Sequence, residues 1–162
     1  LATGEWIAII DHDDNCLPGR LEIQMQQMLE NPGKMLFYAN TEYIDSEGVV
    51  IGRHYDRKNP SNFNMQKGFA VDNLLRHGCF IDTESVMFNK AAALNIGGFN
   101  SKLKFIVDYD FFIRMSEKYN LYTGSEVVSQ WRIHDNQTTK TLSIIAKKES
   151  IELLVILRIQ IS

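Results

Sequence analysis

The chain has 162 residues, a hydrophobic content of 44% and a formal net charge of -3. This length supports one domain with a substantial core and is too short to expect two. The balance of 17 basic against 20 acidic residues lacks the basic excess of a general nucleic-acid binder, so we expect no nucleic-acid partner.

Local patterns predict an alternation of strands and helices along the chain. In the first half we expect a strand at 6–10, a helix within 17–34, a strand at 35–40, a hairpin turning at 46–48 and a surface loop at 53–64. In the second half we expect a helix within 65–78, a strand within 79–89, helices at 90–96 and 108–119, a strand at 121–131 and a last helix from about 142, capped by Thr138 or Thr139. This alternation predicts an α/β sandwich.

The two cysteines, Cys16 and Cys79, lie far apart and form no metal-type pair. A disulfide framework would need more of them, which favours a reducing compartment. No run of residues reaches the roughly 20 apolar positions of a membrane span. We therefore expect a cytoplasmic protein.

The run "WIAIIDHDDN" at residues 6–15 ends a buried strand in a crowded acidic tip. Unpaired carboxylates this close repel one another, so the residues Asp11, Asp13 and Asp14 predict a bound cation. A solvated loop is the simplest alternative.

Two other acidic motifs fit the tip less well. Asp11, Asp13, Asn15 and Glu22 fall at EF-hand positions, but Cys16 replaces the turn glycine and a strand precedes the loop. A phosphatase of the haloacid dehalogenase type would use Asp11 as its nucleophile, but it would place a threonine at position 15 and add a downstream acidic pair. That phosphatase, and a non-catalytic remnant that binds sugar or a partner, remain alternatives.

The third motif is the Asp-x-Asp of nucleotide-sugar glycosyltransferases, and four segments in order support it. The segment "ATGEWIAIIDHDDNCLPGRLEIQ" resembles the donor site of family 2 glycosyltransferases, and "IDSEGVV" resembles their mid-domain hairpin. The segment "SVMFNKAAALNIGGFNSKLKFIVDYDFFIRM" resembles the acceptor side, and "WRIH" followed by "NQTT" is similar to the closing motif. The resemblance spans about residues 2–139 and implies a partial GT-A fold, a three-layer α/β/α sandwich with a mixed central sheet.

The resemblance also implies roles for individual residues on the donor side. Asp13 would ligate Mn²⁺ or Mg²⁺, with His134 as a further ligand. Asp11 would contact the donor ribose or a metal-bound water. Asp14 would orient the residues that contact the metal and the donor, without being a direct metal ligand. The donor would be a nucleoside-diphosphate sugar, with a UDP-sugar as the first expectation.

On the acceptor side, the resemblance makes Asp108 the catalytic base of an inverting transfer. Val107 stands where the family has Glu, which alters the surroundings of the base but keeps the base itself. Gly97 and Gly98 would shape the acceptor pocket beside Asp108. The acceptor would be a glycan or a lipid-linked sugar, in polysaccharide or cell-surface glycan synthesis.

The family's opening strands, which bind the nucleotide base, have no counterpart before Leu1. We expect residues 1–139 to form a partial domain with an exposed sheet edge and weak nucleotide binding, and residues 140–162 to form a C-terminal helix. The apolar stretch "IELLVILRIQIS" is expected to pack against the domain. A peripheral contact with the inner face of the membrane and a homo-oligomeric interface are the alternatives.

Overall fold

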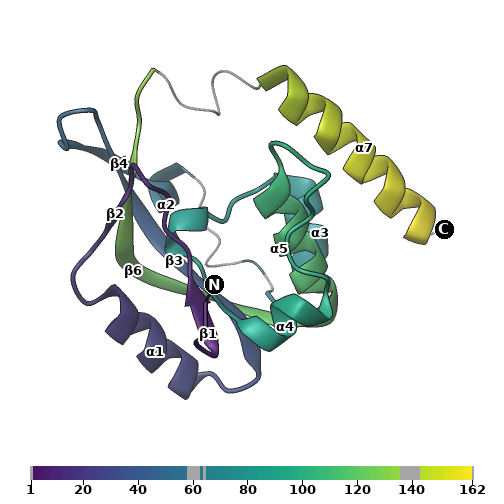
Figure 1. The fold of residues 1–162 in the computed structure, drawn as a ribbon, viewed down its shortest axis with the longest axis horizontal. Coiled ribbons are helices and arrows are strands. Elements are labelled where there is room, and N and C mark those ends of the chain that lie inside the picture. The colour runs from purple at the N-terminus through teal and green to yellow at the C-terminus, as the bar shows by residue number, and fades with distance from the viewer. Residues whose placement is uncertain (1, 58–62, 64, 136–142, 162) are drawn as a thin grey trace.

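A computed structural model describes residues 2–57, 63, 65–135 and 143–161, and it has a mixed α/β architecture (Figure 1). Six strands form one sheet within these residues, in the order β1-β5-β3-β6-β2, and β4 pairs with β3 beside this path. The strands are β1 Trp6–Ala8, β2 Asn15–Cys16, β3 Lys34–Ile44, β4 Val50–Arg53, β5 Met87–Asn89 and β6 Asn120–Arg132. The predicted alternation of strands and helices is confirmed.

The two long strands, β3 and β6, run parallel at the centre of the sheet. β5 is antiparallel to β3, and β1 is antiparallel to β5, so the sheet is mixed. Most of β3 is buried, as expected for a strand that is covered on both faces. β1 lies at an edge, with β5 as its partner within the part of the chain that the structure describes.

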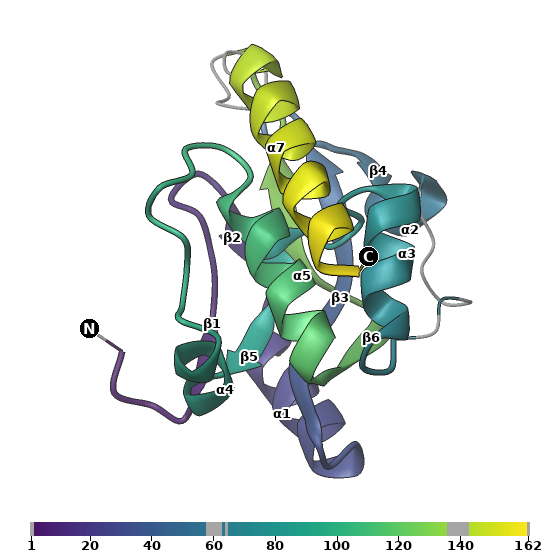
Figure 2. The same ribbon diagram turned by 90° about the vertical axis from the view of Figure 1, so that its right-hand side faces the viewer.

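Helices cover both faces of the sheet (Figures 1 and 2). They are α1 Arg20–Glu30, α2 His54–Arg57, α3 Phe69–His77, α4 Lys90–Asn95, α5 Val107–Lys118 and α7 Ser143–Ile161, with a 3-10 turn, η2, at Thr83–Ser85. α1 lies on one side, and α3 and α5 lie on the other. Phe111, Phe112 and Met115 of α5 are fully buried in the main core, as their helical spacing predicts. The predicted sandwich is thus confirmed.

Some element boundaries differ from the sequence-based expectation. The loop expected at 53–64 contains α2, which begins at the buried His54. β1 ends at Ala8 because β5 begins at Met87, although the Ile9 N–H still donates to the Val86 carbonyl at 3.1 Å. The expected caps Thr138 and Thr139 lie outside the described residues. Among the helices that the structure describes, none is both long and apolar enough to cross a bilayer.

α1 buries its polar residues and exposes apolar ones. Leu21 and Leu29 are 56% and 70% exposed, whereas Arg20 is 2% exposed. The Arg20 guanidinium donates to the Ile9 carbonyl at 2.8 Å and to the Val86 carbonyl at 3.0 Å. The Ile9 carbonyl directly follows β1 and the Val86 carbonyl directly precedes β5. Arg20 therefore links α1 to the backbone just before the acidic tip.

We expect Arg20→Met to lower the free energy of unfolding by about 3 kcal/mol, because it removes two charge-assisted hydrogen bonds and leaves the Val86 carbonyl with the Ile9 N–H as its donor. Urea unfolding measures this change. The control is Arg76→Met, which removes an exposed guanidinium paired with Asp72 on the surface of α3. Equal midpoints for Arg20→Met and the unmodified protein would show that Arg20 contributes nothing to stability.

Candidate catalytic cleft

The acidic tip is held by the end of β6. The Arg132 backbone N–H donates to Oδ1 of Asp14 at 2.8 Å, and its Nε donates to the Asp13 carbonyl at 3.1 Å. Its Nη1 donates to the carbonyls of Asp45 and Ser46, which lie in the β3–β4 turn. Arg132 therefore ties the tip to this turn through backbone groups.

Asp13 and His134, the two predicted metal ligands, lie next to each other. Nε2 of His134 is 3.0 Å from Oδ2 of Asp13. The hydrogen bond with His134 holds the pKa of the Asp13 carboxyl below its ordinary value. The structure thus brings this predicted pair together, and its role in metal binding stays a prediction.

A second acidic group forms where Glu84 of η2 meets the tip. Asp11, Asp14 and Glu84 each offer a carboxylate oxygen, and these oxygens lie within 4.8 Å of one another. Glu84 is only 7% exposed, and burial, followed by the charge of Asp82, raises its pKa to about 9. Burial likewise raises the pKa of Asp14. Carboxylates that are this close and partly buried need a bound proton or a bound cation to offset their charge.

The acidic group fits a hard divalent cation. Oδ2 of Asp14 is buried and has no hydrogen-bond donor in the described part of the chain. The carboxyl of Glu84 can hydrogen-bond the carboxyl of Asp14 only when one of these two carboxyls carries a proton. Oxygen ligands suit Mg²⁺ and Mn²⁺, so the ligand chemistry agrees with the predicted metals.

Asp108, the predicted base, lies in the first turn of α5. The Thr83 hydroxyl donates to Oδ2 of Asp108 at 2.9 Å, and the Tyr109 N–H donates to Oδ1 at 2.7 Å. Burial raises the pKa of the Asp108 carboxyl, and the hydrogen bond from Thr83 opposes this rise. Asp108 is thus held in one orientation, and its role as the base stays a prediction.

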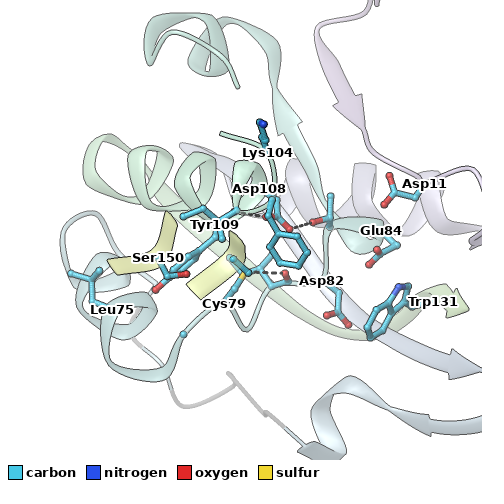
Figure 3. A pocket seen from close by; sticks show the side chains of 16 residues that line it. Asp11, Leu75, Cys79, Asp82, Glu84, Lys104, Asp108, Tyr109, Trp131 and Ser150 are labelled. Carbon is cyan, nitrogen blue, oxygen red and sulfur yellow. Dashed lines mark hydrogen bonds between the residues drawn. The ribbon is translucent and has the colours of Figure 1, made fainter. Parts of the chain in front are cut away.

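Asp11, Glu84 and Asp108 line one cleft of about 610 Å³. Figure 3 shows Asp11, Glu84 and Trp131 toward one end, Leu75 and Ser150 toward the other, and Asp108 and Tyr109 between them. The walls come from the acidic tip, η2, α3, β6, α7 and the loop before α5. The fold therefore brings the predicted donor carboxylate Asp11 and the predicted base Asp108 into one space.

Gly97 and Gly98 lie elsewhere. Both have positive φ, at 86° and 68°, and they end α4. Arg114, paired with Asp110, donates to the Gly98 carbonyl at 2.8 Å and fixes this turn to α5. Gly98 lines a separate apolar groove with Phe99 and Phe111. The structure does not bring the glycines into the cleft of Asp108, and their acceptor role stays a prediction.

Glu84 and the buried residues behind it were not predicted from the sequence. Nε2 of His54 donates to the Phe80 carbonyl at 2.7 Å, and Nδ1 lies 2.9 Å from Oδ2 of Asp82. Nδ1 of His54 is also hydrogen-bonded with the Tyr43 hydroxyl at 2.8 Å, and Oδ2 of Asp82 has no hydrogen-bond donor in the described part of the chain, so His54 lies beside Asp82 without anchoring it. The available signal was an acidic pair, Asp82 and Glu84, in the polar stretch 82–85 between the apolar residues 79–81 and 86–88.

Comparison with known proteins relates the chain to one family. A family model described as glycosyltransferase-like family 2 matches residues 1–159. An uncharacterised glycosyltransferase of Rickettsia typhi is 29% identical over 143 residues, which cover 85% of this chain and 42% of that protein. The O-antigen biosynthesis glycosyltransferase WbnJ of Escherichia coli is 32% identical over 142 residues, or 83% of this chain and 50% of WbnJ. The hyaluronan synthase of Pasteurella multocida is 26% identical over 144 residues, or 88% of this chain and 14% of the synthase. The chain thus spans about half or less of these relatives.

Proposed function

Because this chain belongs to the glycosyltransferase-like family 2, we propose that its cleft transfers a sugar from a nucleoside-diphosphate donor to a hydroxyl of a glycan or lipid-linked acceptor. The observation that carries the proposal is the cleft that Asp11, Glu84 and Asp108 share. The names of WbnJ and the hyaluronan synthase support a role in polysaccharide or cell-surface glycan synthesis. A UDP-sugar is the proposed donor.

The donor diphosphate belongs at the acidic end of the cleft, where a divalent cation offsets the repulsion between carboxylates and phosphates. Asp11, Asp14 and Glu84 are the proposed ligands, since their oxygens converge within 4.8 Å. Asp13 and His134 are the alternative set, because they already share a hydrogen bond. When bound, Mn²⁺ or Mg²⁺ neutralises the charge that develops on the departing diphosphate.

Asp108 performs the proton transfer in this proposal. The acceptor oxygen forms a bond to the anomeric carbon as the bond from that carbon to the diphosphate breaks, and Asp108 takes the hydroxyl proton. Attack from the side opposite the leaving group inverts the anomeric carbon. Thr83 keeps Oδ2 oriented through its hydroxyl, so the carboxylate needs little reorganisation.

A panel of UDP-, GDP- and dTDP-sugars, offered with aryl glycosides as acceptors, tests the proposal. We expect release of nucleoside diphosphate that depends on Mn²⁺ or Mg²⁺ and stops when EDTA removes the metal. Hydrolysis of p-nitrophenyl phosphate, with a phosphoryl group trapped on Asp11, would support the phosphatase alternative instead. Turnover of neither substrate class would favour a non-catalytic remnant.

A further inference from the structure

α7 carries one side chain that is bound by three successive backbone groups of another segment. Glu149 accepts hydrogen bonds from the N–H groups of Lys104 at 2.8 Å, Phe105 at 2.9 Å and Ile106 at 3.1 Å. Burial would raise the pKa of Glu149, but these three donors hold it below the ordinary value. Hydrogen bonds to an ionised carboxylate are stronger than neutral ones, so this contact is a firm anchor.

The same face of α7 lines the catalytic cleft. Ala146 and Ser150 line it, and Leu153 packs against the main core. With Glu149 they occupy positions i, i+3, i+4 and i+7, which share one side of a helix. Ile144 and Ile151 are 82% and 63% exposed, on the part of α7 that faces away. Figures 1 and 2 show α7 on the outer side of α5 and α3.

The anchored loop leads directly to the predicted base. Lys104, Phe105 and Ile106 all line the cleft, and Ile106 is the residue before α5. Asp108 follows two positions later. Ser150 lies toward the end of the cleft opposite Asp11 and Glu84 (Figure 3). α7 therefore borders the end of the cleft remote from Asp11 and Glu84, and the loop that it anchors lies between this end and those two residues, next to Asp108.

We propose that α7 forms the acceptor-side wall of the cleft and that Glu149 is a positioning residue that holds the wall and loop 104–106 in place. This inference rests on the proposed glycosyl transfer. It assigns acceptor binding to the α7 end and donor binding to the end of Asp11 and Glu84.

The test compares Glu149→Gln with Glu152→Gln, whose glutamate is exposed on the same helix and lies 4.0 Å from Lys148. Glu149→Gln keeps the shape of the side chain and removes its charge. We expect it to raise the KM for an aryl glycoside acceptor by about 10-fold or more, as loss of a charged hydrogen-bond acceptor predicts. The KM for the donor stays unchanged, because the carboxylates at the opposite end of the cleft keep their positions. Amide hydrogen exchange at residues 104–106 becomes faster.

Ala146→Phe provides a second variant with the anchor intact. Its larger side chain narrows the acceptor end, so the acceptor KM rises while exchange at residues 104–106 stays slow. An unchanged acceptor KM in both variants, or an equal rise in the donor KM, would overturn the assignment. Absence of donor turnover in the unmodified protein would instead contradict the proposed function, and this inference would be rejected with it.

Discussion

Asp108→Asn is expected to lower the rate of sugar transfer by about 10²- to 10⁴-fold, the usual contribution of a general base. The amide has nearly the shape of the carboxyl and can still accept a hydrogen bond from Thr83, but it cannot take the acceptor proton. Burial raises the pKa of Asp108. The base works only when ionised, so transfer falls as the pH drops through a pKa above the ordinary aspartate range. Initial rates measured across pH test both statements.

The matched control for Asp108→Asn is Asp72→Asn, which changes an exposed carboxylate on α3. We expect Asp72→Asn to transfer sugar at the unmodified rate, and Asp108→Asn to bind UDP and Mn²⁺ as the unmodified protein does. A normal transfer rate for Asp108→Asn would remove Asp108 from the proposed mechanism. A joint loss of UDP binding and transfer would make Asp108 a donor-binding or folding residue.

Glu84→Gln is expected to weaken Mn²⁺ binding by at least about 10-fold, because it removes one of three converging carboxylates. Burial raises the pKa of Glu84 to about 9, so at neutral pH the metal-free protein must protonate this carboxyl on folding, whereas Gln needs no proton. The metal-free variant therefore unfolds at a higher temperature than the metal-free unmodified protein. Added Mn²⁺ then stabilises the unmodified protein more than the variant, since a bound ion stabilises the folded state. Thermal unfolding with and without Mn²⁺ measures both effects.

Two further variants decide between the proposed ligand sets. Asp13→Asn tests the pair of Asp13 with His134, and Glu152→Gln changes an exposed carboxylate on α7 as the control. Full Mn²⁺ stabilisation in Glu84→Gln together with its loss in Asp13→Asn would move the cation to Asp13 and His134. Equal stabilisation in all the variants would exclude a specific cation at either place.

Local pattern alone predicted much of the fold and part of the site. Apolar runs and helical spacing predicted β1, α1 and α5, because these signals lie within a few neighbouring residues. The acidic tip was visible because its carboxylates follow one strand directly. Asp108 came from a resemblance that extends over most of the chain. The structure places it in one cleft with Asp11, and its role as the base stays a prediction.

Other features depend on contacts between distant segments, which no local pattern contains. Glu84 becomes important only because η2 packs beside the acidic tip. Arg20 is buried because it satisfies two carbonyls at the ends of β1 and β5, against the usual exposure of arginine. Glu149 lies on a helix whose apolar end predicted packing against the domain, with a membrane contact or an oligomeric interface as alternatives, and no polar anchor. Each of these polar residues is fixed by backbone or charged groups that the folded chain brings to it.

The most direct measurement is a Mn²⁺ titration of the ¹⁵N-labelled protein in the presence of UDP, followed by ¹H–¹⁵N spectra. Paramagnetic Mn²⁺ broadens the amide signals nearest to it, so its position is read without any assay of activity. The proposed donor site predicts the strongest broadening at residues 11–14 and 83–85, with much weaker broadening in Glu84→Gln. Broadening centred on the separate acidic groove of Glu22, Glu30 and Glu126, or spread evenly over the protein, would contradict it.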